Sequence, residues 1–277
     1  MDRLTSQEAL LLLEWQIELG ASETIGETPV DRYAQAAEEA ARKAAPQAPR
    51  AAQPQFQAPS VGAGAAAPAP LKDAPDEDPV EAARQAAAGA FDLPALHDAL
   101  AHFPHCGLKK GARSLVFADG QPGARVMIIG EAPGRDEDIH GKPFVGRAGQ
   151  LLDRMLAPIG LSRQAETLED AVYITNILPW RPPQNRDPQR DEMAMMLPFI
   201  QRHIALAKPE ILVLMGNIAC EALLGRRGIT RLRGQWAEAA DLPCLPMFHP
   251  AYLLRSPHAK REAWADLLAL RAKLNES

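Results

Sequence analysis

The chain has few cysteines, few aromatic residues and no long apolar run. Its 277 residues include three cysteines, Cys106, Cys220 and Cys244, at wide spacings. An odd number of widely spaced cysteines supports neither a disulfide framework nor a zinc site, so we expect reduced thiols. No stretch is apolar and long enough to span a bilayer, and the N-terminus lacks a basic segment followed by an apolar core. These absences favour a cytoplasmic protein with no membrane contact.

Large apolar side chains are nearly missing from one stretch near the N-terminus. Between Pro46 and Pro70, fifteen of twenty-five residues are Ala or Pro, and Phe56 is the only aromatic residue. Such a stretch cannot bury enough apolar surface to offset its chain entropy. We therefore predict an N-terminal helical arm over residues 1–44, a disordered Ala/Pro-rich linker over 45–78 and a folded domain over 79–277.

The N-terminal arm contains one strongly apolar helical pattern. It runs from about Ser6 to Leu19, includes Leu10, Trp15 and Ile17 on its apolar positions, and ends at Gly20. This helix has no apolar neighbour in the sequence around it. We expect residues 6–19 to dock either on the folded domain or on a protein partner.

The formal net charge of -5 is unevenly distributed. Residues 1–80 carry thirteen acidic and six basic side chains, whereas residues 81–277 carry 22 acidic and 24 basic ones. An acidic chain argues against nucleic-acid binding when it is taken as a whole, but the folded part is weakly basic. Several arginines of this part could face phosphates or simply form a solvated surface: Arg226, Arg227, Arg231, Arg233 and Arg255.

Short apolar runs alternate with helical patterns in the folded part. We predict strands at residues 125–129, 171–177, 211–215 and 242–248, and helices at about 147–159, 189–206, 217–224 and 258–274. This alternation predicts a three-layer α/β/α domain with a mostly parallel, four-stranded sheet. Ligands of such sheets bind at the carboxyl ends of the strands. Unusual residues follow each predicted strand: Gly130, Asn176, Gly216 and His249.

Two segments that follow the first predicted strand could bind an anion and a flat ring, respectively. Gly130-Glu131-Ala132-Pro133-Gly134 must turn sharply and present bare backbone N–H groups. An anion-binding loop and a simple tight turn both explain it. Lys142-Pro143-Phe144-Val145-Gly146 places an aromatic ring in a loop, either as a local core residue or as a platform on which a base stacks.

The remaining segments add polar groups. Asn176 ends an apolar strand, where an amide without partners costs about 1 to 3 kcal/mol, although a turn or cap would also satisfy it. Asn185-Arg186-Asp187-Pro188 forms a polar loop. His249 leaves the last strand just before Pro250, and a lone histidine is more often structural than catalytic. Tyr252-Leu253-Leu254-Arg255 follows, and its leucines could simply begin the terminal helix.

In this order and at these separations, the segments resemble the motif set of the family 4 uracil-DNA glycosylases. The resemblance runs from about residue 103 to residue 273. It implies that residues 79–277 form a uracil-DNA glycosylase-like catalytic domain whose partner is uracil-containing DNA. Such an enzyme, expected as a monomer, flips deoxyuridine out of the DNA and hydrolyses the N-glycosidic bond in base excision repair.

The resemblance also implies a role for each residue. His249 would stabilise the departing uracil, and Glu131 would act as a base or as a structural acceptor. Ala132 stands where other branches of the superfamily carry a water-activating Asp. The substrate would contact Gly130, Ala132, Pro133, Gly134, Phe144 and Asn176, with uracil stacked on Phe144 and read by Asn176. DNA would contact Arg147, Asn185, Tyr252, Leu253 and Arg255.

One departure from the family concerns its iron–sulfur cluster. The four positions of the cluster ligands carry Phe103, Cys106, Trp180 and Met196, so a single cysteine remains. One thiolate cannot hold a four-iron cluster, and we expect no metal and no other cofactor. We expect Phe103, Trp180 and Met196 to pack together instead. The loop at 185–188 also lacks the basic, histidine-ending insert of the branch that traps DNA covalently, which favours hydrolysis.

Two other functions remain compatible with the sequence. One is a non-catalytic, DNA-binding or replication-associated homologue that is recruited through the N-terminal helix. The other is a nucleotide hydrolase whose anion-binding loop serves a free phosphate. Detection of abasic sites, DNA binding without cleavage, or attack on free dUMP would separate the three functions.

Overall fold

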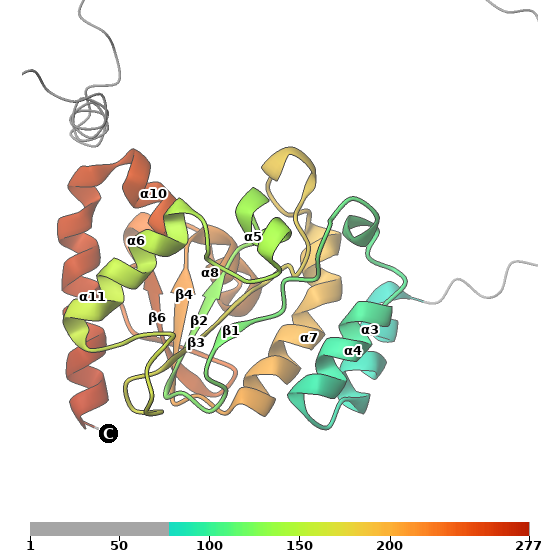
Figure 1. Cartoon of the computed structure of the whole chain (residues 1–277), viewed down its shortest axis with the longest axis horizontal. Coiled ribbons are helices and arrows are strands. Elements are labelled where there is room, and N and C mark those ends of the chain that lie inside the picture. The colour runs from blue at the N-terminus through green and yellow to red at the C-terminus, as the bar shows by residue number, and fades with distance from the viewer. Residues whose placement is uncertain (1–77, 277) are drawn as a thin grey trace, which may run out of the picture. The chain divides into compact units, whose positions relative to one another are not determined.

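The computed structural model describes residues 78–276. The N-terminal arm, its predicted helix at 6–19 and all of the predicted linker except residue 78 lie outside these residues. The described part is a six-stranded sheet with helices on both faces (Figure 1). The prediction of a three-layer α/β/α fold is therefore confirmed.

The centre of the sheet is parallel. The strand order is β1-β3-β2-β4-β6-β5. The parallel strands are β2 (Val126–Gly130), β3 (Val172–Asn176), β4 (Ile211–Met215) and β6 (Leu242–Met247). The short antiparallel strands β1 (Asp119–Gly120) and β5 (Ala237–Ala239) form the two edges. The prediction of four strands was wrong in missing these edges, because two or three residues are too few to show a period of two.

Strand β2 shows how two layers cover the sheet. Val126 and Ile128 belong to a hydrophobic cluster with α6 (Arg147–Leu156) and α11 (Lys260–Glu276). Met127 and Ile129 belong to a second cluster with α7 (Arg190–Ala207) and α8 (Asn217–Leu224). All four side chains are fully buried. The alternation follows from the period of two along a strand and separates the two faces of the sheet.

The other helices lie outside this framework. Helices α3 (Pro79–Gly89) and α4 (Leu93–His102) pack against α7 (Figure 1). Helices α5 (Arg135–His140), α9 (Ile229–Leu232) and α10 (Pro250–Arg255) are short. Further 3₁₀ turns occur at Gly107–Lys110, Ala157–Ile159, Pro183–Asn185 and Pro257–Ala259. In residues 78–276 no helix has the length and apolar character needed to cross a membrane.

A buried histidine joins α7 to the sheet. His203 is 2% exposed, and its Nε2 forms a 2.9 Å hydrogen bond with the Tyr173 hydroxyl of β3. Its ring stacks on Phe117 with 4.4 Å between the ring centroids. Burial lowers the pKa of His203 from 6.5 to about 3. The imidazole is therefore neutral in the folded protein at neutral and mildly acidic pH.

We expect the free energy of unfolding to fall as the pH is lowered from 7 to 5. The unfolded chain binds a proton at this histidine near pH 6.5, whereas the folded protein does not until about pH 3. Protons therefore favour the unfolded state, and His203 accounts for a loss of about 2 kcal/mol over this interval. Thermal unfolding at both pH values should show a smaller loss for His203→Gln, which keeps a polar partner for Tyr173 but does not titrate. An equal loss in both proteins would refute this assignment.

Candidate active site

A cavity of about 430 Å³ lies at the carboxyl ends of the parallel strands. The loops after β2, β3 and β6 and the loop before α6 contribute to its walls. Most residues predicted for the site line it: Glu131, Ala132, Pro133, Gly134, Phe144, Asn176, Asn185, His249, Tyr252 and Arg255. Gly130, Arg147 and Leu253 do not. Segments more than a hundred residues apart in the sequence thus meet in one cavity.

Phe144 forms one wall of this cavity in an unusual backbone conformation. Its φ of 53° lies in the left-handed region, which costs a residue other than glycine about 1 to 3 kcal/mol. The ring is stacked near the His249 ring, with 5.3 Å between the centroids and 26° between the planes. A conformation of this cost persists only when the surrounding structure imposes it.

Gly130 supports the site from beneath without lining it. A Cβ atom at this position would overlap Oδ1 of Asn176 and lie 2.6 Å from the Phe144 ring. Gly130 also pairs with Asn176 in the sheet register. The absence of a side chain therefore lets the aromatic ring and the amide approach the end of β2 together.

Asn176 presents an unused amide to the cavity. The residue is 3% exposed and ends β3. No hydrogen bond of its side chain is found within residues 78–276. Buried polar side chains almost always have a hydrogen-bond partner. An amide that is left open in a cavity is typical of a group that binds a ligand through one donor and one acceptor.

His249 is held as a neutral N–H donor. It precedes α10, and its Nδ1 accepts the backbone N–H of Ala251 at 3.1 Å. An accepting Nδ1 leaves the ring proton on Nε2. Burial and, to a smaller extent, the positive charge of Arg255 lower the pKa of His249 to about 4. Nε2 can therefore donate a hydrogen bond at neutral pH without carrying a full charge.

Three carboxylates line the cavity, Glu131, Glu137 and Asp187, and two of them, Glu131 and Asp187, influence each other's charge. Burial raises the pKa of Glu131, and the neighbouring Asp187 raises it further, while Arg227 and Arg255 act in the opposite direction. Asp187 was not predicted as a site residue, although it lies two positions after Asn185 in the same motif. Together the two carboxylates can stabilise positive charge on a ligand.

The loop that carries Asp187 is fixed at both ends. Arg186 donates to both carboxylate oxygens of Glu192 on α7, at 2.9 and 2.6 Å. This pairing lowers the pKa of Glu192. Asn185 has a left-handed φ of 52°, and its Oδ1 accepts a 2.7 Å hydrogen bond from Nε of Arg181. The loop is therefore anchored, as a loop that positions side chains around a ligand must be.

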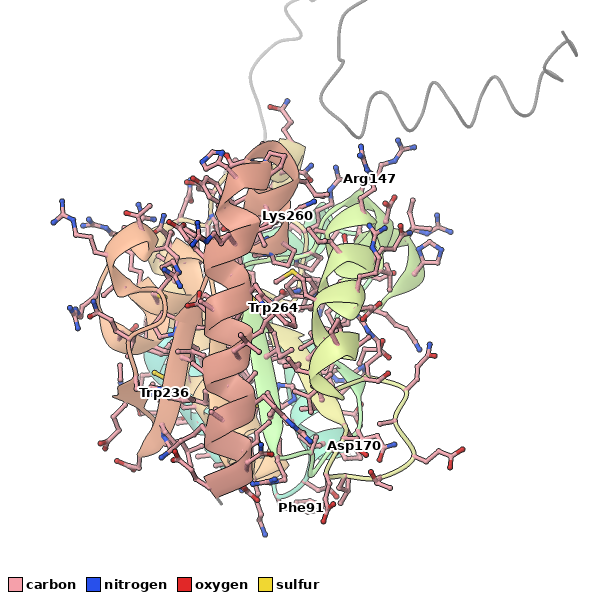
Figure 2. All side chains as sticks on the ribbon, turned by 90° about the vertical axis from the view of Figure 1, so that its left-hand side faces the viewer. Phe91, Arg147, Asp170, Trp236, Lys260 and Trp264 are labelled. Carbon is pink, nitrogen blue, oxygen red and sulfur yellow. The ribbon has the colours of Figure 1, made fainter. Side chains whose placement is uncertain are left out.

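Two of the predicted DNA contacts lie elsewhere. Leu253 is fully buried in a hydrophobic cluster with Leu151 and Phe248, because the turn of α10 directs it inward. Its side chain therefore cannot contact DNA in this conformation, and the prediction for Leu253 is corrected. Leu254 beside it is partly exposed. Arg147 is exposed at the start of α6 (Figure 2), and it is not among the residues that line the cavity.

Residues 117–268 match the family described as the Uracil DNA glycosylase superfamily. The chain belongs to this superfamily. Among its relatives, the Type-4 uracil-DNA glycosylase of Pyrobaculum aerophilum is 36% identical over 186 residues, which are 64% of this chain and 92% of that protein. The protein of the same name from Archaeoglobus fulgidus is 38% identical over 170 residues, 58% of this chain and 82% of that protein. The Type-5 uracil-DNA glycosylase of Thermus thermophilus is 33% identical over 153 residues, 52% of this chain and 68% of that protein.

The iron–sulfur cluster of the type-4 branch does not fit the side chains of this superfamily member. Phe103, Cys106, Trp180 and Met196 are each at most 3% exposed and lie in one hydrophobic cluster. Cys106 supplies the only thiol among them, and burial raises its pKa, which disfavours the thiolate that binds iron. Phe103 packs edge-on against Phe199 of α7 at 5.2 Å. Buried side chains of one hydrophobic cluster thus occupy the positions of the cluster ligands.

Proposed function

We propose that this protein is a uracil-DNA glycosylase that releases uracil from DNA in base excision repair. The observation that carries the proposal is the meeting of Phe144, Asn176 and His249 around one cavity. Uracil offers two apolar faces, a hydrogen-bonding edge and an oxygen, O2, that gains negative charge when the base departs. A ring, an open amide and a neutral N–H donor complement these three features. The names of the type-4 relatives support the same activity.

Uracil recognition rests on Phe144 and Asn176. The flipped base stacks against the Phe144 ring, and the Asn176 amide donates to O4 and accepts from N3–H. Cytosine carries an amino donor in place of O4 and an acceptor at N3. With the amide in the same orientation, its NH2 faces the amino group of cytosine and its oxygen faces N3, so neither hydrogen bond forms and cytosine is rejected.

Cleavage rests on His249 and the carboxylates. The bond between N1 of uracil and C1′ of the sugar breaks, and its electron pair moves to the base. The Nε2–H of His249 stabilises the negative charge on O2, while Glu131 and Asp187 face the positive charge on the sugar. Glu131 orients the water that adds to C1′, because the methyl group of Ala132 cannot do so. The water loses a proton, and the departing uracil finally gains one.

The rim of the cavity would hold the DNA. Arg255 and Tyr252 line the cavity, and Arg147 lies exposed near the same end of the domain (Figure 2). In place of Leu253, the partly exposed Leu254 is the side chain we assign to the space left by the flipped base. One chain contributes all of these groups, as a monomeric enzyme requires.

Oligonucleotides with a single uracil, single-stranded or paired with guanine, test this function. Incubation with the whole protein followed by alkali should reveal cleavage at the uracil and none at cytosine or thymine in the same position. DNA binding without abasic sites would favour the non-catalytic alternative, and release of uracil from free dUMP would favour the nucleotide hydrolase. Equal cutting by a parallel preparation of His249→Ala would indicate a contaminant.

Gly130→Ala should lower kcat/KM for uracil excision by about 100-fold, because a new methyl group displaces Phe144 and Asn176 by about 1 Å. Circular dichroism should show a folded protein. Gly107→Ala is the matched control, since a Cβ there meets nothing within 4 Å. Normal kinetics for Gly130→Ala would show that the tight packing at this glycine does not position the substrate groups.

A further inference from the structure

The loop that carries Phe144 is held on one side by an arginine that belongs to none of the motifs. Arg163 follows α6, and its side chain is 8% exposed. Its guanidinium donates to the carbonyl oxygens of Pro143 at 3.0 Å and Phe144 at 2.9 Å. Arg163 does not line the cavity. It therefore contacts the backbone on which the aromatic ring stands and not the ligand space itself.

The position of Arg163 is itself well determined. Its Nε donates to Asp153 of α6 at 2.8 Å, and its Nη1 donates to Asp119 of β1 at 3.1 Å. Ser162, the residue before it, forms an isolated parallel bridge with Ala171, which directly precedes β3. The guanidinium thus links two carboxylates to the Phe144 loop. Such a planar group with several fixed donors is suited to this task.

A carboxylate holds the same loop from the other side. Oε1 of Glu137, on α5, accepts the backbone N–H groups of Val145 at 3.0 Å and Gly146 at 2.9 Å. Oε2 accepts the N–H of Gly134 at 3.0 Å. One side chain therefore ties the loop after β2 to the loop that carries Phe144.

These bonds fix both peptide units that flank Phe144. Arg163 holds the preceding unit through the Pro143 carbonyl. It also holds the carbonyl of the following unit, whose N–H, that of Val145, is bound by Glu137. The orientations of these two units set φ and ψ of Phe144, and φ is the unfavourable 53°. Gly149 leaves room for this arrangement, because a Cβ there would overlap the Phe144 carbonyl.

We propose that Arg163 and Glu137 are positioning residues that impose the left-handed conformation of Phe144 and so place its ring for the flipped base. The proposal rests on the function proposed above. Arg163 does not line the cavity, and Glu137, which does, uses both carboxylate oxygens to accept backbone N–H groups, so neither is assigned a part in the chemical step. Arg163 acts through the backbone carbonyls of the loop, and Glu137 acts through its amides.

Kinetics on uracil-containing DNA test the effect on the substrate. We expect Arg163→Met to lower kcat/KM by 10- to 100-fold, mainly through a higher KM, because the stacked ring binds ground state and transition state alike. Arg163→Lys should retain only part of the kcat/KM that Arg163→Met loses, since an ammonium group cannot reproduce the planar set of donors. Arg125→Met is the matched control. It removes an ion pair with Glu210 at 2.8 Å, at the opposite end of β2, and should stay within twofold of the wild type.

A double-mutant cycle separates positioning from general destabilisation. If Arg163 acts through Phe144, Arg163→Met should not lower kcat/KM any further in a protein that already carries Phe144→Ala. The same result is expected for Glu137→Gln. Fully additive losses in kcat/KM would overturn the proposal.

Hydrogen exchange supplies a readout that does not depend on activity. In Arg163→Met the amides of Val145 and Gly146 should exchange faster, while those of β4 remain protected. Unchanged exchange at both amides would overturn the proposal even in an active enzyme. Absence of uracil release by the wild type would instead refute the proposed function, and the exchange result would still show whether Arg163 holds the loop.

Discussion

His249→Ala should slow uracil release by about 10²- to 10³-fold and leave DNA binding nearly unchanged. The lost group is the N–H donor that stabilises negative charge on O2, and this charge develops only as the glycosidic bond breaks. Because Nδ1 accepts the N–H of Ala251, Nε2 is the nitrogen that carries this proton. Single-turnover kinetics with saturating enzyme measure the chemical step directly, and fluorescence anisotropy measures DNA binding.

The pH dependence distinguishes a neutral donor from a charged one. The pKa of His249 is lowered to about 4, so the wild-type rate should not decline as the pH rises from 6 to 8. A charged imidazolium of ordinary pKa would lose its proton over this range, and the rate would fall with it. Such a fall, absent from His249→Gln, would refute the neutral-donor mechanism.

Asn176→Asp should reduce the preference for uracil over cytosine by at least about 100-fold. The exchange removes the N–H donor to O4 and keeps only oxygens, which no longer oppose the amino group of cytosine. The measurement is the ratio of kcat/KM values for uracil and cytosine at the same position of one oligonucleotide. The amide has no other partner within residues 78–276, so the exchange breaks no hydrogen bond, but a carboxylate at this 3% exposed position should lower the thermal stability.

Asn217→Asp is the matched control for this exchange. Asn217 lies outside the cavity, and its Oδ1 accepts the N–H groups of Gly228 at 3.0 Å and Ile229 at 2.9 Å. Asp keeps both acceptor bonds, so the uracil preference should not change. An unaltered preference in Asn176→Asp would show that the base is recognised by other groups.

The local pattern of apolar and polar residues was sufficient to predict the central strands and helices of the fold. The predicted strand at 211–215 and helix at 217–224 coincide with β4 and α8, because an apolar run of this length that is bounded by Gly216 is too short for a buried helix and fits a buried strand. The predicted helix at 147–159 corresponds to α6 and the 3₁₀ turn that follows it. The edge strands β1 and β5 were missed because their pairing depends on a neighbouring strand and not on their own composition.

The sequence motifs predicted most of the residues that line the cavity, but not how their side chains are arranged in it. Residue type and spacing were enough to predict that Phe144, Asn176 and His249 line the cavity, since each is an unusual residue at the end of a strand or in a loop. Spacing could not tell which of two adjacent leucines faces inward, because that depends on how α10 packs on Leu151 and Phe248. It also could not reveal Asp187 as a neighbour of Glu131.

The sequence by itself determined the layered α/β fold, the superfamily to which the chain belongs, and the lack of three of the four cluster cysteines. These follow from side-chain identity and from periods of a few residues. Only the tertiary structure decided that the Asn176 amide is open, that His249 is a neutral donor, and that Arg163 and Glu137 hold Phe144. Those properties depend on burial and on hydrogen bonds between residues far apart in the chain, and no local pattern encodes them.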